Sequence, residues 1–153
     1  MAKLSHVDDQ GRAKMVDVGP KSLQQRQAQA AGVIALSAEA ISRIRENQMK
    51  KGDVLGTAQL AGIQAAKLTP RLIPLCHPLI LDYIDVTLSL DDQGISANAE
   101  VKCIGRTGVE MEALTAVSVA LLTVYDMCKA VDKRMQINDI HLVKKEKFDV
   151  ENG

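Results

Sequence analysis

Aromatic residues are nearly absent from this chain, which has no Trp, one Phe and two Tyr. A core must therefore be built from Ala, Val, Leu and Ile, and little is present on which nucleic-acid bases could stack. Net charge is lacking too, because 19 Lys and Arg residues balance 19 Asp and Glu residues. Non-specific nucleic-acid binding depends on a basic surface, so both shortages argue against a nucleic-acid partner.

Cysteines are also few, and Cys76, Cys103 and Cys128 are widely spaced and form no CxxC motif. The stretch MAKLSHVDDQGRAK at the start lacks the apolar segment of a signal peptide. No apolar run approaches the roughly 20 residues of a membrane span. We therefore expect a cytoplasmic protein with no membrane partner. The three histidines are just as scattered, so the spacing predicts no metal site.

Apolar residues, in contrast, are plentiful: they make up 46% of the 153 positions, which is enough for one folded domain over residues 1–153. There is no internal repeat, low-complexity block or linker. Residues 1–25 are polar and turn-rich, and we expect an arm or a small hairpin there. Residues 144–153 are charged, and we expect a solvated tail.

Three helices are predicted from capping residues and periodicity. Ser37 is a candidate N-cap for a helix over 38–48. Gly52 and Asp53 open a second helix, rich in small residues that permit close packing, and Pro70 is expected to end it. GRTG then leads into the longest helix, over about 109–133, with Thr107 as a candidate N-cap.

Strands are predicted where apolar and polar residues alternate. RQAQAAGVIAL (26–36) shows the pattern weakly, whereas YIDVTLSL (83–90), ISANAEVKCI (95–104) and QINDIHLV (136–143) show it clearly. DDQG (91–94) is typical of a hairpin turn. The order predicts an α+β, ferredoxin-like βαββαβ fold with an extra helix in the first crossover. Helices would cover one face of a four-stranded antiparallel sheet, leaving the other face for partner chains.

The loop RLIPLCHPLIL (71–81) places Cys76 and His77 between two prolines. Proline on each side excludes a helix interior and stiffens the connection. Two interpretations stay open: a buried thiol beside a hydrogen-bonded imidazole, or a rigid loop that presents His77 and backbone N–H groups to a ligand. A Cys–His nucleophile pair is not favoured, because neighbouring side chains in extended chain diverge.

The long apolar helix carries three carboxylates. Glu110 and Glu112 lie in its first turn, where the helix dipole alone would favour them. Asp126 has Lys129 at i+3, so the simpler interpretation is a salt bridge. The functional alternative is an acid–base pair in a partly dry pocket, where a pKa can be shifted into a useful range.

Two helix starts are preceded by basic residues, Lys51 before Gly52–Asp53 and Arg106 in GRTG. Such residues are common near helix ends for structural reasons. Together with free N–H groups they also suit an anion, so they suggest a phosphate-bearing small molecule. No P-loop motif is present.

Six segments resemble the MoaC family, the cyclic pyranopterin monophosphate synthases of molybdenum cofactor biosynthesis. They are MVDV (15–18), KGDV (51–54), AGIQAAK (61–67), LIPLCHPL (72–79), TGVEMEALTAVSVA (107–120) and YDMCKAVDK (125–133). The resemblance implies a lyase that converts (8S)-3′,8-cyclo-7,8-dihydroguanosine 5′-triphosphate to cyclic pyranopterin monophosphate and pyrophosphate. It also implies a ferredoxin-like subunit in a homohexamer built as a trimer of dimers.

The resemblance also implies roles for particular residues. Asp126 matches the family's catalytic acid/base, and Lys51 and Lys129 match lysines tied to activity. The positions that match substrate-binding segments or basic residues near the site are Leu75, Cys76, His77, Met111, Glu112, Arg26 and Lys67. Two positions depart from the family pattern: Gln59 stands where Arg is common, and Arg106 where Lys is common.

No metal ligand set and no cofactor are implied, although Mg²⁺ on the substrate triphosphate is compatible with the resemblance. The alternative function is a ligand-sensing regulatory module, because small βαββαβ domains can bind metabolites without chemistry. The set Asp126, Lys129 and Lys51 discriminates between the two, since a sensor needs no acid–base pair.

Overall fold

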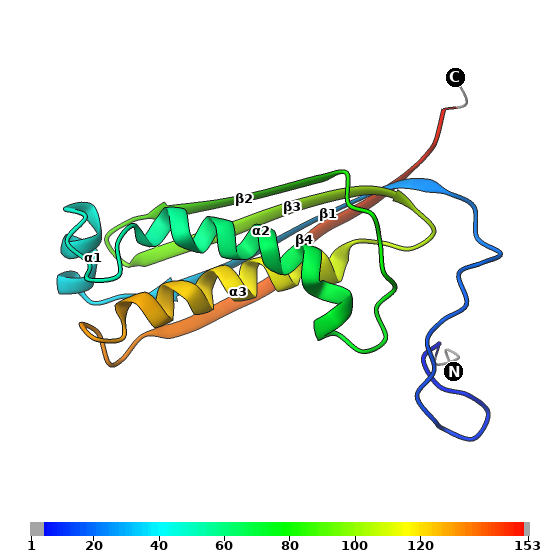
Figure 1. Ribbon diagram of the computed structural model, residues 1–153, viewed down its shortest axis with the longest axis horizontal. Coiled ribbons are helices and arrows are strands. Elements are labelled where there is room, and N and C mark those ends of the chain that lie inside the picture. Colours follow the sequence, from blue (N-terminus) through cyan, green and yellow to red (C-terminus); the bar gives the residue numbers. More distant parts are fainter. Residues whose placement is uncertain (1–4, 152–153) are drawn as a thin grey trace.

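The computed structural model of the chain describes residues 5–151. Its elements are β1 (Gln24–Ala35), α1 (Ala38–Arg45), α2 (Val54–Leu72), β2 (Tyr83–Leu90), β3 (Gly94–Gly105), α3 (Glu110–Cys128) and β4 (Gln136–Asp149). The four strands form one sheet in the order β2-β3-β1-β4, with every neighbouring pair antiparallel (Figure 1). The predicted α+β, ferredoxin-like fold with an extra helix in the first crossover is confirmed.

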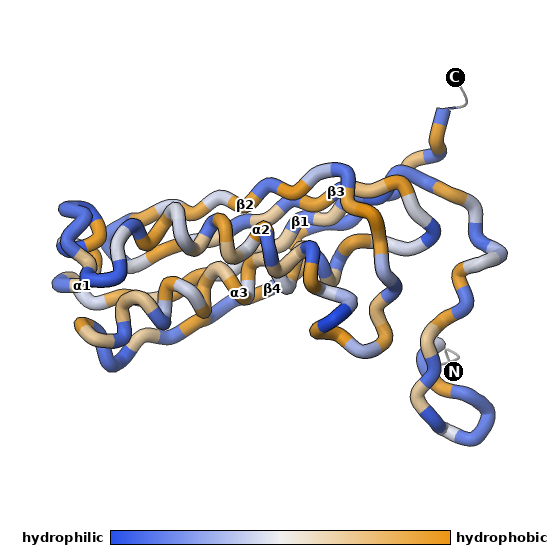
Figure 2. The backbone as a smooth tube through the Cα atoms, in the orientation of Figure 1, coloured by the Kyte–Doolittle hydropathy of each residue, from blue (hydrophilic) through white to orange (hydrophobic). Residues whose placement is uncertain are grey.

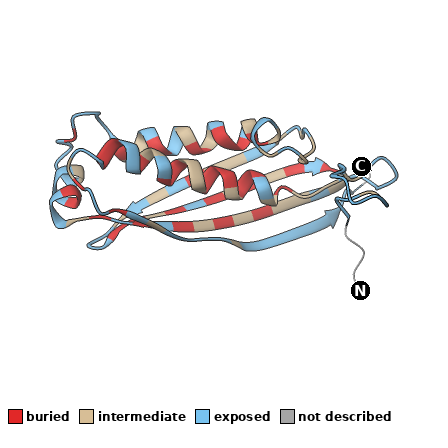
Figure 3. Cartoon of the chain, turned by 90° about the horizontal axis from the view of Figure 1, so that it is seen from below, coloured by how far each residue is buried: buried red, intermediate tan, exposed pale blue. Residues whose placement is uncertain are grey.

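The two long helices, α2 and α3, lie on one face of the sheet, as expected (Figure 3). The alternating residues of β3 face them, and Ile95, Ala97, Ala99, Val101 and Cys103 are all buried. Hydrophobic and hydrophilic residues alternate along the strands, and hydrophobic residues recur along both long helices (Figure 2). The apolar layer between helices and sheet is therefore the core of the domain.

Small residues bring α2 and α3 close together, as their composition predicts. Ala58 and Ala65 of α2 and Ala116 and Ala120 of α3 are buried. A Cβ added to Gly62 would lie 3.0 Å from the carbonyl oxygen of Ala116. The two helices run in opposite directions, so the start of α2 lies beside the end of α3 (Figure 1). This arrangement determines which sequence segments meet at each end of α3.

Several predicted helix boundaries are wrong. Helix α1 ends at Arg45 because Asn47 takes φ +51°, and Lys50 and Lys51 lie in the turn after it, outside any helix. Pro70 lies inside the last turn of α2 and does not end it. The helix ends at Leu72, because Ile73 precedes Pro74 and takes an extended conformation, as residues before proline do.

Helix α3 also differs from its predicted bounds. Its N-cap is Val109, which makes no side-chain capping bond, so Thr107 is not the N-cap. The helix ends at Cys128, where the carbonyl of Cys128 accepts from the N–H groups of Val131 and Asp132 in a tight turn. By length and composition α3 could cross a membrane, but about half of its apolar window is buried, as in a core helix.

The predicted charged tail is largely a strand. β4 continues to Asp149, and residues 144–149 pair with the first half of β1. These residues are exposed to solvent, as expected, but they form a strand because β1 begins at Gln24 and offers them backbone partners over that length. The preceding residues 5–23 form an arm with one isolated bridge, Val7 to Ala13, which closes a small turn.

The sheet face opposite the helices is polar in its centre. The Glu100 carboxylate accepts hydrogen bonds from Gln27 and Gln29, both at 2.9 Å, and lies 2.8 Å from the Lys102 ammonium. Lys102 in turn lies over the ring of Tyr83. Within the described chain no helix covers this face (Figure 3).

Candidate active site

The predicted site residues form two groups at opposite ends of α3. At its C-terminal end, Asp126 binds two lysines: its carboxylate lies 2.7 Å from Lys51 Nζ and 2.8 Å from Lys129 Nζ. Lys51 also donates to the Asp126 carbonyl at 3.2 Å. The turn that carries Lys51 is shaped by Gly52, at φ +95°, and by Asp53, which caps α2. The structure thus brings together all three residues assigned to catalysis.

The charge state of this first group follows from its contacts. Hydrogen bonds from Lys129 and then Lys51 lower the pKa of Asp126 to about 2, and Asp126 raises the pKa of Lys129. The salt-bridge interpretation of Asp126 is therefore confirmed. The partly dry pocket is not found in one chain, because the Asp126 side chain is 54% exposed. A single subunit holds a solvated carboxylate between two ammonium groups.

A cavity of about 560 Å³ includes Met49, Lys51 and Met127 in its lining. Of the three clustered residues only Lys51 lines it, and Asp126 and Lys129 do not. Its walls come from α1, the following turn and the end of α3.

The second group lies at the other end of α3, around a cavity of about 380 Å³. The predicted substrate-binding residues that line it are Leu75, Cys76, His77, Met111 and Glu112. The proline-flanked loop is held in a turn by a hydrogen bond from the Cys76 N–H to the Ile73 carbonyl, at 3.1 Å. The structure thus unites the two sequence segments that the resemblance assigns to substrate binding.

His77 is fixed by the N-terminal arm. Its Nε2 lies 2.6 Å from the carbonyl oxygen of Val16, which can only accept, so Nε2 carries the proton and donates it. Nδ1 is then left for a ligand or solvent. Ser5, His6 and Lys21 of the arm also line the cavity. Apart from the MVDV segment, which contains Val16, no sequence feature predicted the contact between Val16 and His77.

Glu112 is the most perturbed carboxyl group in the described chain. Glu112 is only 3% exposed. Burial, and then the charge of Glu110, raise its pKa to about 7, against a lowering by its own backbone N–H. The helix dipole would lower the pKa of Glu112, so burial has the larger effect on this pKa. Glu112 can therefore exchange a proton near neutral pH.

Cys76 is half-buried in the same cavity. Burial, and then the nearby Glu112 charge, raise the pKa of its thiol. A raised pKa reduces the thiolate fraction, and the thiolate is the nucleophile. These surroundings suit a contact residue better than a nucleophile.

Arg26 and Lys67 are the remaining residues predicted to bind substrate. Arg26 lines a neighbouring cavity of about 250 Å³, which shares Gly108 and Glu110 with the cavity around His77. Lys67 is exposed on α2 and lines none of the cavities described here. Lys145 and Lys147 line the same cavity as Arg26, and the sequence analysis, which assigned both to a solvated tail, did not predict this position.

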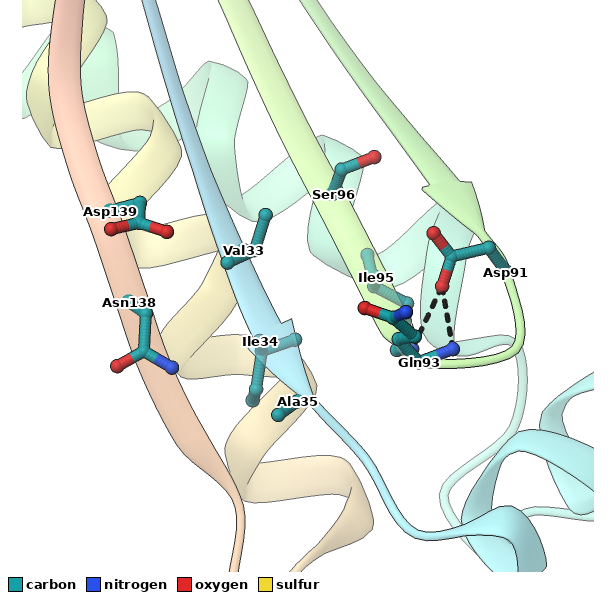
Figure 4. Close-up of a pocket in the computed structure, with 10 residues that line it drawn as sticks. Val33, Ile34, Ala35, Asp91, Gln93, Ile95, Ser96, Asn138 and Asp139 are labelled. Carbon is teal, nitrogen blue, oxygen red and sulfur yellow. Dashed lines mark hydrogen bonds between the residues drawn. The ribbon is translucent and has the colours of Figure 1, made fainter.

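A further depression of about 340 Å³ lies on the sheet near the β2–β3 hairpin (Figure 4). None of the predicted site residues lines it. Its Asp91 carboxylate accepts from the N–H groups of Gln93 and Gly94, at 2.8 and 3.0 Å, which builds the predicted DDQG turn. The Asp91 carboxylate therefore serves the hairpin.

Comparisons with known proteins identify the family of this chain. The family model described as the MoaC family matches residues 15–147. The chain belongs to the MoaC family. A protein of Roseiflexus sp. (strain RS-1), named cyclic pyranopterin monophosphate synthase, is 54% identical over 147 residues, which is 95% of this chain and 93% of that protein. A protein of the same name from Thermoanaerobacter sp. (strain X514) is 54% identical over 144 residues, covering 93% of this chain and 91% of that protein.

The family match covers all the predicted site residues, although Ser5 and His6 of the cavity lining precede it. The matched range begins at Met15, just before the Val16 contact to His77, and ends at Lys147 on β4. Among residues 5–151, no three His, Cys, Asp or Glu side chains come together as a metal-binding group.

Proposed function

We propose that this chain is a cyclic pyranopterin monophosphate synthase. It is a lyase that converts (8S)-3′,8-cyclo-7,8-dihydroguanosine 5′-triphosphate to cyclic pyranopterin monophosphate, with release of pyrophosphate, in molybdenum cofactor biosynthesis. The observation that carries the proposal is the cluster of Lys51, Asp126 and Lys129 in a chain of this family. A metabolite sensor needs no acid–base pair, so this set favours an enzyme over the alternative function.

The reaction requires proton transfers while one ring system opens and another forms, and neutralisation of charge as pyrophosphate leaves. We assign the proton transfers to Asp126 and Lys129, with Lys51 assisting. Deprotonated Asp126 starts as a base, since its pKa is about 2. Accepting a proton from substrate would then require the two lysine contacts to loosen.

Binding of the substrate is assigned to the other group. The Glu112 carboxyl suits the guanidine-like edge of the base, because an ionised carboxylate accepts two parallel N–H donors. A donor-rich ligand would favour the ionised form and lower the Glu112 pKa from about 7. His77, with Nε2 committed to Val16, offers Nδ1 to the substrate, and Leu75, Cys76 and Met111 supply the contact surface. Arg26 is assigned to binding the substrate phosphates. The same role was predicted for Lys67, but its exposed position on α2 does not support it.

Each active site is proposed to draw its residues from two chains. Glu112 and Asp126 are 14 residues apart on one helix, or roughly 21 Å along its axis at 1.5 Å per residue. An antiparallel copy of α3 across a two-fold axis would bring the start of one helix beside the end of the other. The exposed apolar side chains of Leu122 and Tyr125, next to Asp126, give α3 a surface suited to such a contact.

The assembly is proposed to be a homohexamer, a trimer of dimers, that acts in the cytoplasm without nucleic-acid or membrane partners. No resident cofactor is proposed, and Mg²⁺ would enter only with the substrate triphosphate.

The test of the proposed function is incubation of the purified protein with the cyclic triphosphate, followed by assays for pyrophosphate and for the cyclic pyranopterin. Equimolar formation of both products is expected. Binding of the triphosphate without release of pyrophosphate would instead identify a sensor module and refute the proposal.

A further inference from the structure

Lys51 follows a helix that is only lightly packed against the rest of the domain. Helix α1 lies at the end of the domain where α2 begins and α3 ends, and few of its residues contact other helices or strands (Figure 1). Of its residues only Ala40 and Ile41 are buried. The cavity of about 560 Å³ is lined by α1, the following turn and the end of α3, so these parts are not fully packed against one another. Packing alone therefore fixes the position of α1 relative to α3 only weakly.

Helix α1 and the turn after it form one unit, which backbone hydrogen bonds hold together. The N–H of Gln48 donates to the Arg43 carbonyl at 2.8 Å. The N–H of Gly52 donates to the Met49 carbonyl at 3.0 Å, and Met49 is buried. A shift of α1 would therefore carry Lys51 with it.

The side chain of Asp132 joins this unit to the end of α3. Its carboxylate accepts a hydrogen bond from the N–H of Ser37, the N-cap residue of α1, at 2.6 Å. It accepts a second from the N–H of Arg134 at 2.9 Å. The Asp132 N–H itself donates to the carbonyl of Cys128, the last residue of α3, at 3.0 Å. One residue thus connects the start of α1 to the turn that contains Lys129.

The Asp132 carboxylate is well suited to hold this link. Asp132 is 6% exposed, and within residues 5–151 it forms no ion pair. Burial raises its pKa, but hydrogen bonds from the backbone N–H groups of Arg134 and Ser37 outweigh burial and lower the pKa below its ordinary value. Loss of the Ser37 contact would leave a buried charge and a backbone N–H without partners, so the link resists displacement.

We propose that Asp132 is a positioning residue: by fixing α1 to the end of α3, it sets the position of Lys51 relative to Asp126 and Lys129. Lys129 lies three residues before Asp132, and Lys51 lies at the end of the unit that begins at Ser37, so the link joins the two segments that carry the catalytic candidates. Its effect on turnover rests on the proposed function. Misplacement of a catalytic group by about 1 Å can lower a rate by about 100-fold, which gives such a link a use.

The test uses two substitutions of Ser37 that differ in the backbone N–H. Ser37→Ala and Ser37→Pro both remove the hydroxyl that caps α1, but only proline also removes the N–H that Asp132 accepts. The φ of Ser37, −67°, already suits a proline ring. Asp132→Asn weakens the link from the other side, because one carboxylate oxygen becomes an NH2 group that cannot accept.

Asp91→Ala is the control for a general loss of stability. The Asp91 carboxylate also accepts from two backbone N–H groups, but in the β2–β3 hairpin. This variant should therefore lose comparable hydrogen bonds without disturbing the link between α1 and α3.

The first measurement needs no substrate. Hydrogen bonds from Lys129 and then Lys51 lower the pKa of Asp126 to about 2, and ¹³C NMR follows this carboxyl group. In Ser37→Pro and Asp132→Asn the pKa should rise by about half a unit or more, because an adjacent opposite charge shifts a carboxyl pKa by about one unit or more. Ser37→Ala and Asp91→Ala should leave it unchanged. In a Lys51→Ala background neither Ser37→Pro nor Asp132→Asn should raise it further.

The second measurement is turnover of the cyclic triphosphate, well below the melting temperature of each variant. In Ser37→Pro and Asp132→Asn, kcat should fall about tenfold or more. KM should stay within about twofold of wild type, because substrate binding is assigned to the other end of α3. Ser37→Ala and Asp91→Ala should keep the wild-type kcat even where they lower the melting temperature.

The outcomes separate the positioning role from the proposed function. Wild-type values of kcat and of the Asp126 pKa in folded Ser37→Pro and Asp132→Asn overturn the role. Equal changes in Ser37→Ala and Ser37→Pro overturn it too, because the cap would then be responsible. Failure of both link variants to fold, where Ser37→Ala folds, overturns a role confined to positioning. A raised Asp126 pKa in a protein that does not convert the cyclic triphosphate supports the link and refutes the proposed function.

Discussion

The Nζ atom of Lys51 lies 2.7 Å from a carboxylate oxygen of Asp126, although the two residues are 75 positions apart in the chain. The contact exists because α2 and α3 are antiparallel, which places the turn before α2 beside the last turn of α3. Both side chains are about half exposed. Ion pairs in such surroundings contribute little to stability, so the proposed catalytic role of these residues can be tested by substitutions that leave the fold intact.

We predict that Asp126→Asn abolishes most activity and leaves the fold intact. The substitution keeps the shape of the side chain and removes the proton acceptor, so turnover should fall by roughly 100-fold or more. The melting temperature should change little, because the two lost ion pairs are solvated. Activity and thermal melting are measured on the same preparation. Near-normal turnover in a folded variant would reject a catalytic role for Asp126.

Lys51 is predicted to be essential, unlike its neighbour. Lys51→Ala should remove turnover with a change in unfolding free energy within about 0.5 kcal/mol, as for most surface substitutions. Lys50→Ala is the matched control, since Lys50 lies in the same turn and lines the same cavity but makes no ion pair among the described residues. The control should keep wild-type turnover. Equal losses of turnover in Lys51→Ala and Lys50→Ala would show that the loss comes from a change in the turn and not from the Lys51 side chain.

Glu112 should make stability depend on pH. Burial raises its pKa from 4.5 to about 7, so the folded state holds this proton over a range in which the unfolded state has released it. Its contribution is therefore fully present below pH 4.5 and is lost as pH rises through 7. At about 1.4 kcal/mol per pKa unit, the loss amounts to roughly 3 kcal/mol.

The measurement is urea unfolding from pH 4 to pH 8 at constant protein concentration, which matters for an oligomer. Glu112→Gln carries a neutral side chain of the same size, so it should remove most of the decline in stability between pH 4.5 and 7. Glu110→Gln, at a half-buried neighbour, should remove only a small part of it. Parallel pH profiles for wild type and Glu112→Gln would contradict the raised pKa.

Most of the fold could be predicted because its signals are local. The alternation in 83–90 and 95–104, the DDQG turn and the Ser37 cap depend on neighbouring residues alone, and all were confirmed; the side chain of Ser37 accepts from the Ala40 N–H. Helix ends were less predictable. Pro70 fits the last turn of a helix that Pro74 ends, and only the three-dimensional course of the chain decides between the two prolines.

The site was predictable residue by residue but not in its geometry. Sequence motifs marked Lys51, Asp126 and Glu112, yet nothing local could reveal that Asp126 is solvated whereas Glu112 is buried. Their burial depends on which loops return to cover α3: the proline-flanked loop and the arm line the cavity with Glu112, whereas the Lys51 turn contacts Asp126 and leaves it about half exposed. The contribution of β4 to the Arg26 cavity was missed because charged residues pair as an edge strand there.

Cys76 is predicted to act as a contact residue. Its thiol pKa is raised by burial, and the charge of the nearby Glu112 disfavours the thiolate further. Cys76→Ser should therefore keep measurable turnover, and mass spectrometry of protein stopped during turnover should find no adduct at Cys76. A trapped thioether or thioester on this residue would overturn the prediction.

The last prediction concerns the shared active site. If each site combines Glu112 of one chain with Asp126 of another, two inactive variants should complement each other. Glu112→Ala and Asp126→Ala are dissociated, mixed and reassembled. In a mixed dimer, one site receives both substitutions and the other receives neither, because contacts across a two-fold axis are reciprocal. Activity should return up to about one working site per mixed dimer.

The controls decide what a negative result means. Each variant is taken through dissociation and reassembly alone, where it should stay inactive, and native mass spectrometry verifies that mixed oligomers form. If verified mixed oligomers stay as inactive as either parent, Glu112 and Asp126 do not complete a site between chains. The roughly 21 Å between them along α3 would then have to be spanned by the substrate within one subunit, or the two residues would serve separate functions.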